Sequence, residues 1–170
     1  MAAHSPIMKE VIARAKSGVR LLAVCNGFQM LVETGLVPGA LLRNNSLKFI
    51  CRQVHLRVEN TKSDFTRRFA PSQVIQVPIA HGEGNYFIDD NGLKSLHDHD
   101  QIAFRYCDAN GQTNEENYNP NGSIDDIAGV INREKTILGM MPHPENSVVT
   151  HAGGHQGIPL FQSMIEAIAA

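Results

Sequence analysis

The feature that most constrains the fold is the apolar run Val19–Val24, which is broken only by Arg20 and ends directly at Cys25. Such a run is typical of a strand that is buried on both faces, as in parallel sheets. The pair Asn26-Gly27 follows, and the segment Phe28–Glu33 then has a helical pattern. The order of strand, sharp turn and helix places Cys25 at the carboxyl end of a central strand, where α/β folds open their ligand crevice.

The remaining pattern predicts helices at both ends of the chain and strands between them. Ser5 is a good cap and Pro6 a good first residue for a helix that ends near Gly18. A last helix is expected over residues 158–168. Five further strands are expected over residues 49–59, 74–80, 102–107, 127–131 and 137–141. This order predicts a single α/β domain, residues 1–170, with a mainly parallel central sheet.

Composition excludes several classes of function. Fifteen Lys and Arg against seventeen Asp and Glu leave a net charge of -2, so nothing favours nucleic acid or an anionic membrane as a partner. The sequence shows neither a membrane span nor the layout of a secretory signal, and we therefore expect a cytoplasmic protein. Three cysteines without a C-x-x-C pair predict neither a disulfide framework nor a zinc knuckle.

Cys25 has the setting of a nucleophile elbow. The helix that follows is expected to lower the pKa of the thiol, and its backbone N–H groups could bind a developing oxyanion. Gly27 would let the helix begin close to the strand. The alternative is that Cys25 is a small buried apolar residue, which is the usual role of a free cysteine. Position in the sequence leaves these two interpretations evenly balanced.

A thiol nucleophile needs a base, and the base needs a group that orients it. His143 and Glu145, in the sequence Met141-Pro142-His143-Pro144-Glu145, could supply both. The neighbouring prolines favour extended backbone, in which residues two apart face the same side. The alternative is a proline-rich turn with an exposed histidine. Together with a cysteine elbow in the same chain, the catalytic interpretation is favoured.

Other polar clusters give weaker signals. The alternating residues 97–100 (His-Asp-His-Asp) could suggest a metal site, but such a stretch is usually a solvated loop. His151 and His155 flank Gly153-Gly154, and a surface loop is again favoured. The sequence has no glycine-rich phosphate loop followed by a lysine, so ATP binding of that kind is not expected.

The residues 23–31 (AVCNGFQML) and 140–145 (MMPHPE) resemble those of class I, triad-type glutamine amidotransferases. More narrowly, the chain is similar to the glutaminase subunits of phosphoribosylformylglycinamidine synthases, which serve purine synthesis. The narrower resemblance is carried by Asn44-Asn45-Ser46, Phe49, Cys51-Arg52, residues 78–84 (PIAHGEG) and residues 119–123 (NPNGS). It extends from about Ser5 almost to the end of the chain and implies a flavodoxin-like domain.

The resemblance also implies roles for individual residues. Cys25 would attack the side-chain amide of glutamine, and His143, oriented by Glu145, would transfer the protons. The N–H of Asn26 would form one side of the oxyanion hole, and Gln29 would contact the bound glutamine. The loop that contains His81 and Gly82 would lie near the glutamine pocket. This chain would need no cofactor; ATP and Mg²⁺ would act in a synthetase subunit, and a small accessory subunit would complete the assembly.

The sequence departs from the family in two places. Relatives usually have glycine at the position of Ala23, where a methyl group should be tolerated. Relatives also begin with a strand, a helix and a second strand that leads into a glycine-rich oxyanion loop. This sequence opens beyond that loop, so the first strands and the loop are expected to be absent. Two alternatives therefore stay open: a glutaminase that serves another synthetase, and a truncated remnant that binds a partner without catalysis.

Overall fold

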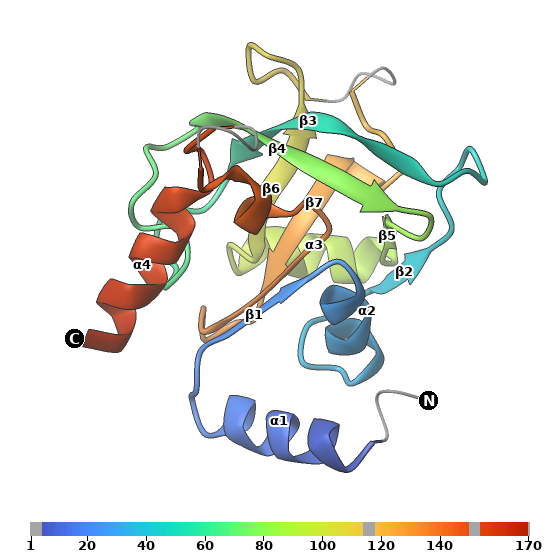
Figure 1. The fold of residues 1–170 in the computed structure, drawn as a ribbon. Helices are drawn as coiled ribbons and strands as arrows, with labels where there is room; N and C mark the ends of the chain where they lie inside the picture. Colours follow the sequence, from blue (N-terminus) through green and yellow to red (C-terminus); the bar gives the residue numbers. More distant parts are fainter. Residues whose placement is uncertain (1–4, 114–117, 150–153, 170) are drawn as a thin grey trace.

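The centre of the protein is a six-stranded sheet, seen in a computed structural model that describes residues 5–113, 118–149 and 154–169 (Figure 1). The strand order is β1 (Leu21–Val24), β8 (Ile137–Met140), β7 (Ile127–Ile131), β6 (Ile102–Cys107), β3 (Ile50–Val58) and β4 (Val74–His81). A separate two-stranded sheet joins β2 (Ala40–Leu42) to β5 (Asn85–Phe87). The helices are α1 (Pro6–Lys16), α2 (Asn26–Glu33), α3 (Asp90–Asp98) and α4 (Ile158–Ala169), with 3₁₀ turns η2 (Ile124–Asp126) and η3 (Pro144–Ser147).

The α/β class is confirmed, but the expectation of a mainly parallel sheet is wrong. Only β1 and β8 pair in parallel, and the other four pairings of the large sheet are antiparallel. A parallel pair needs a long crossover, usually through a helix. No α-helix is described between β3 and β4, between β6 and β7, or between β7 and β8. These consecutive strands can therefore turn back directly on one another.

Strand β1 lies at one edge of the sheet, which corrects the expectation of a central strand. Its described pairing is with β8 alone, in the register Leu21↔Ile137 to Val24↔Met140. Ala23 is buried, whereas the other three residues of β1 are only partly buried. The apolar run reflects packing against the two core clusters rather than a central position in the sheet.

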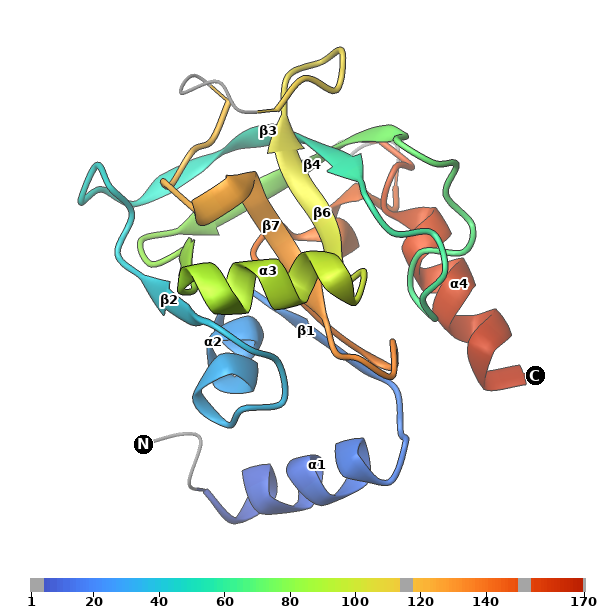
Figure 2. The same cartoon turned by 180° about the vertical axis from the view of Figure 1, so that it is seen from behind.

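Two apolar clusters hold the layers together. One includes Leu160 of α4 with Phe65 and Phe69 from the β3–β4 connection, packed against buried residues of β3, β4 and β6. The other includes Phe28 and Leu31 of α2 and Leu96 of α3. Figure 2 shows α3 crossing in front of β6 and β7. Strand β6 is buried along its whole length, because it runs between these layers.

Most predicted elements are confirmed to within a few residues, including the Ser5 cap and Pro6 start of α1. The sequence interpretation missed β2, β5 and α3. The supposed loop at residues 97–100 is in fact the end of α3, with His97 and Asp98 in the helix and His99 as its cap. Helix α3 was not predicted because its apolar pattern is weak, and Leu96 is its one buried residue. Residues 114–117 and His151 lie outside the described ranges.

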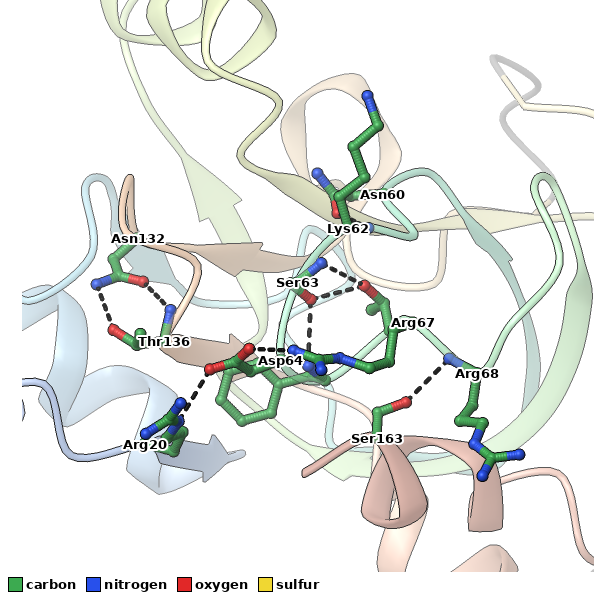
Figure 3. A network of polar contacts seen from close by, with 12 residues as sticks. Arg20, Asn60, Lys62, Ser63, Asp64, Arg67, Arg68, Asn132, Thr136 and Ser163 are labelled. Atoms are coloured by element: carbon green, nitrogen blue, oxygen red, sulfur yellow. Dashed lines mark hydrogen bonds and ion pairs between the residues drawn. The ribbon is translucent and has the colours of Figure 1, made fainter. Parts of the chain in front are cut away.

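The long connection between β3 and β4 ties both ends of the fold together through side chains (Figure 3). Asp64 accepts from Arg20, just before β1, at 2.9 Å and also pairs with Arg67. The backbone N–H of Arg68 donates to Ser163 Oγ in α4 at 3.1 Å. The connection thus fixes α4 and the approach to β1 relative to the sheet.

Candidate active site

Cys25 occupies a strained turn between β1 and α2. It is the N-cap of α2 with φ 54° and ψ -111°, a left-handed conformation that is unusual for a residue other than glycine. Its backbone N–H donates to Met140 O in β8 at 2.9 Å. Strain of this kind persists only where surrounding contacts impose it, and it is frequent at catalytic nucleophiles. The geometry agrees with the predicted elbow.

His143 and Glu145 lie just beyond the end of β8. Because β1 and β8 are parallel and in register, their carboxyl ends meet at the same rim, which also holds Cys25. His143 Nδ1 lies 2.6 Å from Glu145 Oε1. His143 Nε2 is buried and has no hydrogen-bond partner among the described residues. The carboxylate therefore holds Nδ1 as the donor and leaves Nε2 as the nitrogen available for proton transfer.

The two edges of the sheet converge at this rim. The Sγ atom of Cys25, next to the β1 edge, lies 3.8 Å from the carbonyl oxygen of Ala80 in β4, the opposite edge strand. The backbone N–H of His143 donates to Pro78 O in β4 at 2.8 Å. Curling of the sheet thus brings residues from both edges to Cys25.

The expectation of a lowered thiol pKa is wrong for the site without substrate. Burial is the largest effect and raises the pKa of Cys25 above its ordinary value. The backbone N–H of Asn26 acts in the opposite direction, while the negative charge of Glu145 raises the pKa further. The helix N-terminus contributes as predicted, but burial outweighs it, so the resting group is a thiol.

The His81–Gly84 loop packs beside α2 and borders a cavity there. Gln29, one helical turn after Cys25, donates through Nε2 to Glu83 O at 3.3 Å. The side-chain carboxylate of Glu83 lies near Arg43, whose Nε is 3.8 Å from Glu83 Oε1. A cavity of about 180 Å³ opens here, lined in part by Gln29 and Glu83. The predicted substrate residues Gln29, His81 and Gly82 are therefore all on or against one loop.

His81 is buried, and its ring is held by Asn44. Nδ1 lies 3.2 Å from Asn44 Oδ1, and Nε2 has no partner among the described residues. Burial, followed by the nearby charge of His143, lowers the pKa of His81 from 6.5 to about 4. The ring is consequently neutral at neutral pH, with Nδ1 as the donor to the amide oxygen.

Three residues of this site escaped the sequence interpretation as site residues. Asn44 and Asn121, buried completely or almost so, hold the His81–Gly84 loop, and Tyr106 is buried close enough to Cys25 to be affected by its charge. Both asparagines belong to motifs that carried the family resemblance. These side chains come together only in the folded chain, and no local sequence pattern predicts their contacts.

The other polar clusters lie away from this rim. His97 Nε2 is 2.8 Å from Asp125 Oδ2, and Lys94 Nζ is 2.6 Å from Asp98 Oδ2. Among the described residues, no group of three His, Cys, Asp or Glu side chains is arranged to hold a metal ion. A cavity of about 460 Å³ between the α2–β2 turn and the β7–β8 turn contains none of the groups at the rim. No helix in the described ranges is both long and apolar enough to cross a membrane.

Comparison with known families finds a match over almost the whole chain. Residues 3–159 match the model of the CobB/CobQ-like glutamine amidotransferase domain. The chain belongs to this family. Among curated members, it is 51% identical over all 170 residues to the phosphoribosylformylglycinamidine synthase subunit PurQ of Rhizobium johnstonii, of which it spans 73%. It is 52% identical over 169 residues to the PurQ of Rhodospirillum rubrum, again spanning 73% of that relative.

Solved structures share the architecture of this chain. A chain of PurLQS from Thermotoga maritima superposes with a TM-score of 0.83 at 39% identity, over 98% of this chain and 70% of that one. The glutaminase domain of a Trypanosoma brucei CTPS, solved with bound acivicin, has a TM-score of 0.54 at 10% identity, over 89% and 62% of the two chains. The second likeness is one of fold alone.

Proposed function

We propose that this chain is the glutaminase subunit of a phosphoribosylformylglycinamidine synthase. It would hydrolyse glutamine to glutamate and ammonia through Cys25, His143 and Glu145, within a single glutamine amidotransferase domain over residues 1–170. The observation that carries the proposal is the His143–Glu145 contact of 2.6 Å, which leaves the buried Nε2 of His143 at the same rim as the strained Cys25. The naming of relatives at 51–52% identity as PurQ supports the choice of synthase.

The first half-reaction forms a covalent thioester. His143 Nε2 takes the proton of Cys25, and Sγ attacks the side-chain carbonyl carbon of glutamine. The carbonyl oxygen becomes an oxyanion, and the N–H of Asn26, the first residue of α2, is placed to donate to it. The protonated His143 then gives its proton to the nitrogen as the carbon–nitrogen bond breaks. Ammonia leaves, and the γ-glutamyl group stays on sulfur.

The second half-reaction releases glutamate. His143 Nε2 accepts a proton from water, which attacks the thioester carbon, and the proton returns to Sγ as the carbon–sulfur bond breaks. Glu145 keeps Nδ1–H in place and stabilises the charged ring in both steps. Gln29 and the His81–Gly84 loop, including Gly82, hold the amino-acid end of the substrate.

The ammonia would pass to a synthetase subunit that converts formylglycinamide ribonucleotide to formylglycinamidine ribonucleotide. ATP and Mg²⁺ would bind to that subunit, and a small accessory subunit would complete the complex. The PurLQS assembly of the Thermotoga maritima relative supports this arrangement. A thiol nucleophile must stay reduced, which favours the cytoplasm as its location.

The test is synthesis by the reconstituted complex, with glutamine or with free ammonia as the nitrogen source. Cys25→Ala should abolish the glutamine-dependent reaction and spare the ammonia-dependent one. Cys51→Ala, which removes an exposed thiol, is the matched control and should spare both. Wild-type chain that supports neither glutamine hydrolysis nor glutamine-dependent synthesis would point to a non-catalytic binding role. Activity only with a different synthetase would redirect the proposal to that enzyme.

A further inference from the structure

The His81–Gly84 loop begins at the last residue of β4 and ends where β5 begins. Its residues 82–84 have no regular structure, and the loop lies between Cys25 and the Gln29 side of the cavity. Ala80, the residue before it, presents its carbonyl oxygen to Cys25 Sγ. Glu83 within it accepts from Gln29. A small displacement of this loop would therefore move the Glu83–Gln29 contact, while Ala80 is held within β4.

Asn44 holds the loop from one side with every polar atom of its side chain. Its Oδ1 accepts from Gly84 N at 3.0 Å and from His81 Nδ1 at 3.2 Å. Its Nδ2 donates to His81 O at 2.9 Å and to Lys48 O at 2.8 Å. Its backbone N–H also donates to Gly82 O at 3.0 Å. Asn44 is completely buried, so water does not replace these bonds easily.

Asn121 holds the same loop from the other side. Its Nδ2 donates to Gly84 O at 2.7 Å and lies 3.2 Å from the hydroxyl oxygen of Tyr106. Ser123 adds a second donor to Gly84 O at 3.2 Å. Both main-chain polar groups of Gly84 are thus fixed by side chains, the N–H by Asn44 and the C=O by Asn121. The two asparagines are joined to one another through Asn45, whose N–H donates to Asn121 O at 3.0 Å.

The room for this arrangement is limited. A β-carbon on Gly84 would lie 2.3–2.8 Å from ring atoms of His81. The ring, the glycine and the two amides therefore form one closely packed unit, in which each part fixes the next.

We propose that Asn44 and Asn121 are positioning residues for glutamine binding: together they clamp Gly84 and hold the His81–Gly84 loop at the distance from Cys25 and Gln29 that the substrate requires. This inference rests on the proposed glutaminase function and deepens it. Neither amide touches the reacting atoms in the proposed mechanism, so the clamp acts on substrate affinity more than on the chemical step.

The experiment compares wild type, Asn44→Ala and Asn121→Ala in the complex with the synthetase. Both variants should raise the glutamine KM by about 10- to 100-fold, as expected for misplaced binding groups, and change kcat far less. Labelling of Cys25 by a glutamine-like chloroketone should slow in parallel. Alkylation of Cys25 by iodoacetamide, which does not use the amino-acid subsite, should keep its wild-type rate, as should synthesis from ammonia.

Asn132→Ala is the matched control. Asn132 is also a buried asparagine that makes four side-chain hydrogen bonds, but it lies in the β7–β8 turn and contacts no part of the loop. It should lower thermal stability without changing the KM. Gly84→Ala keeps both amides but forces residue 84 and the His81 ring apart. It should therefore reproduce the KM effect, and it provides the test if either asparagine variant fails to fold.

Two results would overturn the proposal: a folded Asn44→Ala or Gly84→Ala with wild-type KM, or an Asn132→Ala with the same KM increase. Failure of the underlying glutaminase assignment looks different, because the wild type itself would then neither hydrolyse glutamine nor react selectively with the chloroketone.

Discussion

The β-carbon of Ala23 in β1 lies 3.2 Å from the point where a β-carbon at position 27 would stand. Ala23 and Gly27 therefore face each other across the elbow, one before Cys25 and one after it. The methyl group of Ala23 is accommodated because the facing residue has no side chain.

Gly27→Ala should consequently be coupled to Ala23. Alanine gains helix propensity over glycine, but the new methyl group would meet that of Ala23 and force the helix or strand to shift. We expect Gly27→Ala to be more destabilising in the wild-type chain than in Ala23→Gly, by about 0.5–3 kcal/mol of coupling free energy. Urea unfolding of the four chains of the double-mutant cycle measures this quantity. Additive effects would show that the two positions do not press on one another.

Substitution of His143 should lower the glutaminase rate more than substitution of Glu145. His143→Ala removes the proton carrier and should lower glutaminase turnover by roughly 10²–10⁴-fold. Glu145→Gln retains a hydrogen-bond acceptor near Nδ1 and should leave a larger residual rate. Steady-state ammonia release by the complex provides the comparison. If both variants turned over at the wild-type rate, His143 and Glu145 would have no catalytic role.

Cys25 should be the one cysteine that a glutamine-like electrophile labels. Cys107 is buried, which raises its pKa to about 11, and Cys51 is exposed but lies outside the site. The pKa of Cys25 is also raised, so iodoacetamide labelling without substrate should keep increasing through the neutral range as the thiolate forms. Peptide mass spectrometry after each reagent locates the label. Chloroketone modification of Cys51 or Cys107 in place of Cys25 would contradict the assignment.

The buried neutral His81 predicts acid sensitivity. Its pKa is about 4 in the folded protein against 6.5 ordinarily, so between these values the unfolded chain binds a proton that the folded chain does not. Stability contributed by neutral His81 is therefore complete above pH 6.5 and is lost progressively as the pH falls towards 4, by up to about 1.4 kcal/mol per pH unit. His81→Gln should have a shallower dependence in this window. Parallel slopes of unfolding free energy against pH would refute the prediction.

The backbone strain at Cys25 predicts that a non-glycine residue at this position lowers the stability of the fold. Glycine adopts positive φ without a steric penalty, whereas alanine does not. Cys25→Gly should therefore be more stable than Cys25→Ala by about 1 kcal/mol, although the proposed mechanism requires both to be inactive. Chemical denaturation of the two variants tests this. Equal stability would mean that the elbow relaxes when the thiol is removed.

The sequence predicted the elements of this fold better than their arrangement. The elbow is local, since strand, Cys25 and helix are contiguous, and His143 and Glu145 are two residues apart. The antiparallel pairing was not predicted, because a buried apolar strand has the same pattern in either sense of pairing. The clamp was also invisible, since Asn44 and Gly84 are 40 residues apart and meet only in the folded chain. The thiol pKa was misjudged because burial is a tertiary property.

Strand β1 has a strand partner on one side only in the described part of the chain. Its residues alternate in the direction of their main-chain groups, and those of Leu22 and Val24 point away from β8. The segment immediately before the nucleophile is thus a template on which another extended peptide can add. Such an addition, from any source, would stiffen the strand that ends at Cys25. The four residues of β1 therefore connect strand pairing at this edge of the sheet with the backbone conformation of Cys25, the residue that follows them.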